Sequence, residues 1–92
     1  MIIAKVVGNL WATKKDESLE GFKFFVVQQT GVAKGRRRPL VAVDGGVGAG
    51  IGDNVLITQG SSARTIYQGK QIPVDAVIVG VIDSVEVNED LL

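Results

Sequence analysis

The sequence predicts a small, mostly β protein, folded as a closed or partly closed antiparallel barrel of five short strands with one or two short helical turns. Short apolar runs rich in β-branched or aromatic residues recur along the chain, and glycine-rich or polar corners separate them. The 92 residues suffice for one domain, in which only about 60 to 65% of the unfolded chain's surface can be buried. The expected core is therefore thin.

The first half of the chain contains two of the expected strands. From Ile2 to Thr13, β-branched residues alternate with polar ones, which predicts a strand whose Trp11 is half buried as a packing aromatic. The polar segment from Lys14 to Glu20 is expected to be an exposed loop with room for one helical turn. Phe22 to Gln29 carries three of the five aromatic residues and predicts a second strand, with those aromatics in the core.

The second half contributes three more strands and a helical turn. Pro39 to Asp44 and Asn54 to Thr58 predict two short strands, with a glycine-rich bend between them. Ser61 and Ser62 are candidates for the N-cap of a single helical turn. Valines alternate from Ala76 to Val87, which predicts the longest strand of the protein.

Composition limits how so small a domain can be stabilised. The chain has no cysteine and no histidine, so disulfides and thiolate zinc sites are excluded, and association with further copies is the remaining means of support. The opening residues lack the basic start of a signal peptide. The apolar stretch from Ala76 to Ile82 is far shorter than the roughly 20 residues that a membrane-spanning helix needs, so no membrane partner is expected.

The ten basic and ten acidic residues cancel, but they are unevenly distributed. Four of the basic residues lie between Lys34 and Arg38, whereas the chain after Lys70 carries five acidic residues and no basic one. This separation favours contacts between subunits over nucleic-acid binding, which usually requires a basic domain. We expect the KGRRR segment to be an exposed loop and not a nucleic-acid site.

The stretch from Val43 to Arg64 reads VDGGVGAGIGDNVLITQGSSAR and is the part of the chain that most invites a functional interpretation. Neither glycine-rich phosphate motif fits it. The GxGxxG pattern meets Ile51 or Val55 where it needs glycine, and a P-loop read from Gly45 lacks its lysine. No nucleotide cofactor is therefore expected, and the glycines indicate close approach of backbones.

Three segments, in order along the chain, carry a resemblance to a known family. They are MIIAKVVGNLWATKKDESLEGFKFFVVQ at the start, VDGGVGAGIGDNVLITQGSSAR in the centre and PVDAVIVGVID near the end. In this combination the chain resembles the small shell vertex proteins of bacterial microcompartments, the EutN/CcmL family of carboxysome and ethanolamine-utilisation shells. It departs from that family in having Gly45 and Gly46 side by side, where a bulkier residue is expected in one position.

This resemblance implies that residues 1–92 form a single shell vertex domain, a five-stranded barrel related to the OB architecture. It also implies a structural function in the cytoplasm: homopentamers that close the vertices of a polyhedral microcompartment shell and meet hexameric shell proteins, without catalysis, cofactor or metal. A layer tiled only by six-sided units stays flat, so closing it requires five-sided units. The carboxysome, ethanolamine, propanediol and glycyl-radical systems all remain open.

Two other classes of function compete with the structural one. An OB-like nucleic-acid-binding module would explain a barrel with a basic loop, but the aromatic strand carries only one basic residue, Lys23, and stacking platforms usually interleave the two. An enzyme could use Asp44, Asp53, Asp75 or Asp83, but each lies at a strand or turn boundary, where aspartate commonly satisfies backbone donors.

The candidate site residues are assigned to subunit contacts or tight turns and not to catalysis. We expect the small residues of the glycine-rich stretch to lie where subunits or backbones meet, and Arg64 to pair with a carboxylate such as Asp44 or Asp75. The full set is Asp44, Gly48, Ala49, Gly50, Gly52, Ser61, Ser62, Arg64 and Asp75.

Overall fold

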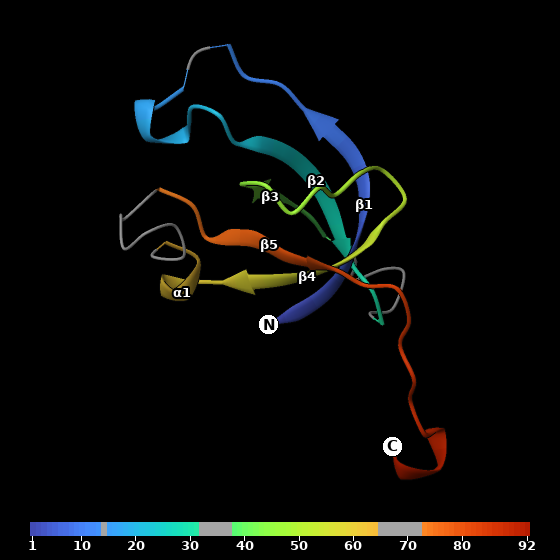
Figure 1. Cartoon of the computed structure of the whole chain (residues 1–92). Helices are drawn as coiled ribbons and strands as arrows, with labels where there is room; N and C mark the ends of the chain where they lie inside the picture. The colour runs from blue at the N-terminus through green and yellow to red at the C-terminus, as the bar shows by residue number, and fades with distance from the viewer. Residues whose placement is uncertain (14, 32–37, 65–72) are drawn as a thin grey trace.

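The computed structural model describes residues 1–13, 15–31, 38–64 and 73–92 (Figure 1). Its strands are β1 (Ile2–Leu10), β2 (Lys23–Gln29), β3 (Pro39–Asp44), β4 (Asn54–Gln59) and β5 (Ala76–Val81). Helical structure in these residues is limited to α1 (Ser61–Arg64) and the 3₁₀ turns η1 (Glu17–Leu19) and η3 (Glu89–Leu91). The prediction of a mostly β protein with short helical turns is confirmed.

The five strands form a closed barrel in the order β1-β2-β3-β5-β4. Four of the five neighbouring pairs are antiparallel, but β3 and β5 run parallel and are in register at one pair, Val43 with Val77. The closed barrel was correctly predicted, and an antiparallel arrangement throughout was wrong. The reason is arithmetic: strand directions that alternate around a ring cannot close when the number of strands is odd.

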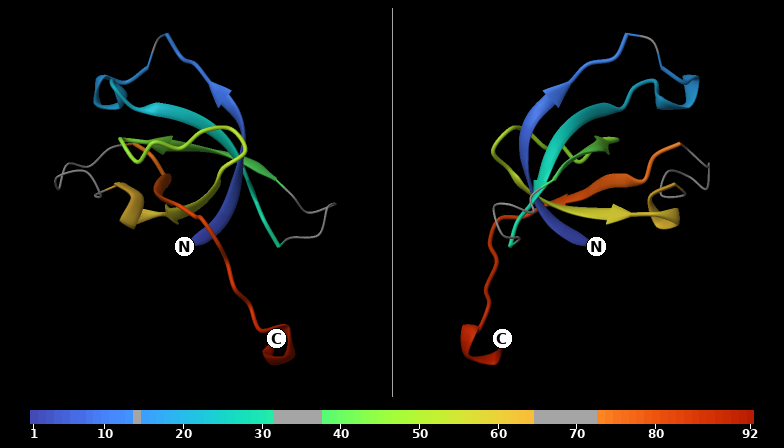
Figure 2. Two further views of the ribbon diagram at one scale, coloured as in Figure 1. Left: turned by 45° about the vertical axis from the view of Figure 1, so that its right-hand side comes forward. Right: turned by 180° about the vertical axis from the view of Figure 1, so that it is seen from behind.

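The last strand is shorter than the alternating valines predicted. β5 ends at Val81, and the chain then leaves the barrel as an extended arm (Figures 1 and 2). Its neighbour β4 supplies only six residues, and the Ile82 N–H donates to the carbonyl of Asn54, the first of them, at 2.8 Å. Beyond that point β4 offers nothing to pair with. The longest strand of the described residues is β1, with nine.

Alternate residues of each strand point into the barrel and form its core. The buried members are Ala4, Val6, Phe25, Val27, Ala42, Ala49, Val55, Ile57, Ala76 and Ile78. A second, smaller cluster on the outer side of the sheet contains Val43, Val77 and Ala63, the last from α1, with Phe22 and Phe24 packed against it. The expectation of aromatic residues in the core holds fully for Phe25, while Phe22 and Phe24 are half buried.

Trp11 contradicts the sequence prediction. Its side chain is 85% exposed, where half burial was expected. The first strand ends at Leu10, which pairs with Phe24 of β2. Trp11 therefore lies just beyond the last paired residues of β1 and β2. A residue at that position has no neighbouring strand to pack against in the same protomer.

Ile57→Ala should lower the free energy of unfolding by about 2–5 kcal/mol, because Ile57 is fully buried and its truncation leaves a cavity in a thin core. Ile3→Ala is the matched control, since Ile3 is 36% exposed on the outer side of the adjacent strand. Urea unfolding at a fixed protein concentration measures both. Equal losses would contradict the assignment of the two faces.

Candidate functional site

The connection between β3 and β4 is organised by the carboxylate of Asp44. Its Oδ1 accepts hydrogen bonds from the backbone N–H groups of Gly46 at 2.8 Å and Val47 at 2.7 Å. Its Oδ2 accepts two more, from Gly48 at 3.0 Å and Ala49 at 2.9 Å. A carboxylate has about four lone-pair positions. The four donors therefore use the whole hydrogen-bonding capacity of Asp44 within its own loop.

These bonds also fix the charge state of Asp44. Burial of the side chain, which is 3% exposed, by itself raises the pKa. The backbone donors at Gly46, Ala49, Val47 and Gly48 outweigh that effect and hold the pKa of Asp44 below its ordinary value of 3.8. An ionised carboxylate with every acceptor position filled suits neither acid–base chemistry nor a further ion pair.

The second half of the connection is anchored to β1. Asp53 Oδ2 accepts from the Gly50 N–H at 2.9 Å, and the Gly52 N–H donates to the Val6 carbonyl at 2.9 Å. The Val6 N–H in turn donates to the carbonyl of Asp53 at 2.9 Å, next to the β-bulge of β1 between Val6 and Gly8. Ala49 lies between the two anchors and packs into the barrel core. The loop thus covers one part of the barrel interior.

The glycines of this loop have different reasons for being glycine. Gly48 and Gly52 have φ values of +93° and +92°, which disfavour any other residue. Gly50 has no positive φ, and a Cβ built on it would meet only Asp53 Oδ2, at 3.8 Å. Among the described residues, nothing requires glycine at position 50. Its assignment to a subunit contact stays a prediction.

The remaining candidate residues lie at the end of the barrel where β4 stops and β5 begins. Ser61 and Ser62 are exposed and are the first two residues of α1, so their predicted N-cap position is wrong by one or two residues; Gly60 precedes the helix. Arg64 and Asp75 are both exposed. The described residues place no ion pair on Arg64. Asp44 has no free acceptor for it, and pairing with Asp75 across subunits stays a prediction.

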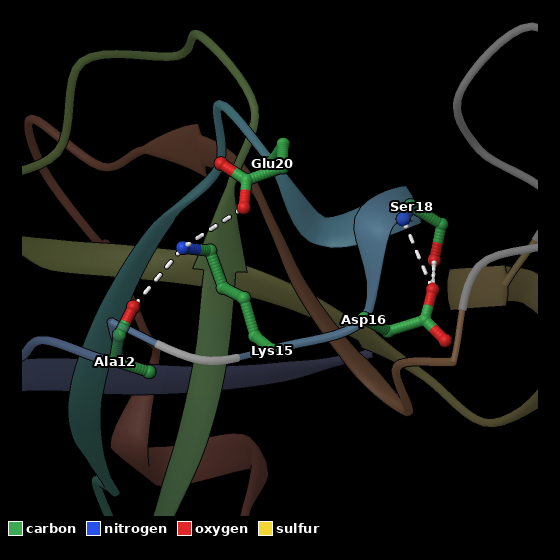
Figure 3. Close-up of polar contacts among 5 residues, drawn as sticks. All are labelled: Ala12, Lys15, Asp16, Ser18 and Glu20. Carbon is green, nitrogen blue, oxygen red and sulfur yellow. Dashed lines mark hydrogen bonds and ion pairs between the residues drawn. The ribbon is translucent and has the colours of Figure 1, made fainter.

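The connection between β1 and β2 is held by its own polar contacts (Figure 3). The Lys15 ammonium donates to the carbonyl of Ala12 at 3.0 Å and lies 3.6 Å from a carboxylate oxygen of Glu20. Asp16 caps η1 by accepting from the backbone N–H and the hydroxyl of Ser18, which lowers the pKa of Asp16. These contacts give the loop a defined shape.

A groove of about 550 Å³ lies between this connection and the glycine-rich loop. Its apolar lining includes Leu10, Trp11, Phe22, Phe24 and Ile51, and its two charged residues are Lys15 and Lys23. This groove was not predicted from the sequence. The available signal was a tryptophan at the end of a strand, which was interpreted as a packing residue.

The described residues contain no cluster of three or more metal-binding side chains. Likewise, no helix in the described part of the chain has the length and hydropathy needed to span a membrane. Most of the KGRRR segment lies outside the described residues, and only its last residue, Arg38, is seen to be exposed. The nucleic-acid interpretation of that segment is therefore not tested by the structure.

The sequence and the fold were compared with known proteins. The model of the family described as ethanolamine utilisation protein EutN/carboxysome matches residues 1–83. The carboxysome shell vertex protein CcmL of Nostoc sp. (strain PCC 7120) is 41% identical over 93 residues, covering 100% of this chain and 92% of that protein. The microcompartment shell vertex protein PduN of Salmonella typhimurium is 37% identical over 89 residues, covering 91% and 97%.

Solved structures agree with the sequence comparison. The pentameric shell protein of the RMM microcompartment superimposes with a TM-score of 0.80 at 38% identity, covering 96% of this chain and 98% of that one.

Asp44→Asn should lower the free energy of unfolding by at least about 2 kcal/mol, because the amide NH₂ faces two backbone N–H groups that then lose their acceptor. Asp16→Asn removes an exposed carboxylate with only local bonds and serves as the control, with a smaller loss expected. Chemical denaturation measures both. A loss for Asp44→Asn no greater than for the control would show that the loop does not depend on this carboxylate.

The stability of the wild-type protein should fall as the pH drops below about 4. The folded-state pKa of Asp44 is lower than its unfolded value, so its contribution is fully present above the unfolded pKa and is lost as the pH falls through the folded one. Asp44→Asn lacks this contribution. Urea midpoints between neutral pH and pH 3 should therefore decline less steeply for the variant, and parallel declines would contradict the assignment.

Proposed function

The chain belongs to the EutN/CcmL family, and on that premise we propose that it is a structural protein whose pentamers close the vertices of a polyhedral bacterial microcompartment shell in the cytoplasm. The observation that carries this proposal is the match over nearly the whole chain to shell vertex proteins, together with the likeness to a pentameric shell protein at a TM-score of 0.80. The protein is not an enzyme.

The geometry of the protomer suits such a function. A vertex requires a rigid unit that repeats five times around an axis. In the closed barrel each strand has a neighbour on both sides, although β3 and β5 pair only at Val43 and Val77, so little sheet edge is left along which copies could add without limit. Asp44 and Asp53 fix the loop that crosses the barrel. The protomer therefore keeps one shape while its outer surfaces make the contacts of the ring.

We further propose that the pentamers meet hexameric shell proteins of the same compartment. A shell needs flat facets as well as corners, and six-sided units supply the facets. Family membership supports association with a shell. The proposal adds that the neighbouring shell proteins are hexameric. Mixing the protein with a purified hexameric shell protein and viewing the products by electron microscopy tests it: closed particles support the proposal, and unchanged open sheets oppose it.

Native mass spectrometry of the wild-type protein should show a pentamer at neutral pH and moderate salt. Gly50→Val and Arg64→Ala should each reduce the pentamer fraction while circular dichroism keeps its β-sheet signal, because the described residues show neither a clash for a Cβ at position 50 nor an ion pair of Arg64. Gly52→Val is the contrasting variant. With φ at +92°, it should strain the protomer itself and lower the thermal midpoint.

A wild-type monomer or hexamer would refute the pentamer. If Gly50→Val and Arg64→Ala both form pentamers with unchanged stability, the glycine-rich stretch from Val43 to Arg64 is a surface turn that takes no part in assembly. Salt-dependent binding of oligonucleotides, lost when Arg36, Arg37 and Arg38 are replaced by alanine, would instead support the nucleic-acid-binding alternative.

A further inference from the structure

The arm after β5 is exposed from residue 83 to residue 92, beyond the hydrogen bond that holds Ile82 to β4. It extends away from the end of the barrel opposite the β1–β2 connection (Figures 1 and 2). The radius of gyration is 13.9 Å, and the longest dimension, 47 Å, is about twice the other two; a compact chain of this length has a radius near 12 Å. The arm is therefore available to a partner.

The arm combines apolar side chains with negative charge. Val85, Val87 and Leu91 are 55%, 58% and 82% exposed. The same segment carries Asp83, Glu86, Glu89 and Asp90 and no basic residue. Among the described residues, the backbone between Asp83 and Val87 forms no hydrogen bond with the barrel. An extended segment with free backbone groups and alternating apolar side chains is typical of a peptide that binds in a groove.

The groove between the β1–β2 connection and the glycine-rich loop has the complementary properties. Its volume of about 550 Å³ lies within the roughly 300–1,000 Å³ of pockets that hold ligands. Its charged lining residues, Lys15 and Lys23, are both basic, and Lys15 is already paired with Glu20 at 3.6 Å. Lys23 makes no ion pair among the described residues. Trp11, which is 85% exposed at the rim, is a residue type that often dominates binding energy.

We propose that the arm of one protomer binds in this groove on a second copy, with Val85 and Val87 against the apolar lining and the carboxylates near Lys23. The inference rests on the pentamer of the proposed function. The six residues from Asp83 to Asn88 can span about 20 Å when extended, close to the 22 and 25 Å widths of the molecule. Because donor and acceptor are different surfaces, the contact repeats head to tail and can close a ring.

Chemical cross-linking tests the pairing directly, because the chain has no cysteine of its own. Val87→Cys in the arm is combined with Ile51→Cys at the groove and treated with a short bismaleimide, which tolerates inexact pairing. Denaturing gels should show a ladder of covalent multiples ending at five. The matched control combines Val87→Cys with Ile3→Cys, on the outer side of β1, and should give no ladder above that of the single variants.

Two results would overturn the proposal. Cross-linking confined to single chains would place the arm in the groove of its own protomer, and a ladder no stronger than the control would place it elsewhere.

Deletion of residues 83–92 provides a second, independent measurement. The deletion should abolish most of the pentamer while the barrel keeps its β-sheet signal, and Trp11→Ala should weaken association about tenfold. A wild-type pentamer whose assembly is unaffected by the deletion, with no specific cross-link, would refute the exchange of arms and leave the proposed function standing. A wild-type protein that forms no pentamer would refute both.

Discussion

The hydrogen bonds to the Asp44 carboxylate are the constraint on which the rest of the structure depends. The chain leaving β3 has to cross the barrel before it can begin β4 beside β1. Asp44 fixes the first half of that crossing through four backbone donors, and Asp53 with Gly52 fixes the second half against β1. The crossing thereby holds β4 at its position beside β1, and it fills part of the interior with Ala49.

The use of aspartate carboxylates as acceptors for backbone N–H groups explains why the protomer suits assembly better than catalysis. Three of its carboxylates hold backbone turns: Asp44 and Asp53 beside the ends of strands, and Asp16 at the start of η1. Its core is built from small and β-branched residues, with Phe25 as the only aromatic side chain that is fully buried in the described residues. Large apolar side chains remain on the outside, Trp11 foremost, and these are the groups through which further copies can add stability.

The elements that depend on local pattern could be predicted from the sequence. Both ends of β3 were predicted correctly, and the helical turn in the loop before Phe22 was placed correctly. Proline, glycine and aspartate mark the ends of these elements through local backbone preferences, which can be recognised in the sequence. The end of β5 could not be predicted in this way, since it depends on the length of β4, a neighbour set by topology. The exposure of Trp11 was missed for the same reason.

In the candidate site, the tight turn of the glycine-rich stretch could be predicted from the sequence, but the hydrogen bonds that hold the turn could not. Arg64 was expected to pair with a carboxylate such as Asp44 or Asp75. The acceptors of Asp44 are filled by the four residues from Gly46 to Ala49, and pairing of Arg64 with Asp75 stays a prediction. A sequence that places aspartate directly before two glycines permits such a turn without specifying it. That at least one pair of neighbouring strands runs parallel follows from counting strands, once five strands and closure are both assumed. That this pair is β3 and β5 depends on the strand order, which counting does not give.

The position of β5 between β3 and β4 has a consequence for synthesis on the ribosome. β5 follows the other four strands in the chain, yet it fills the gap between β3 and β4, the two edge strands of the sheet β3-β2-β1-β4. Until it leaves the exit tunnel, β3 and β4 each present an unpaired edge, and the core cluster lacks Ala76 and Ile78. The nascent protein thus passes through a stage in which its sheet has two unpaired edges, and it is exposed to aggregation until β5 is free to close the barrel.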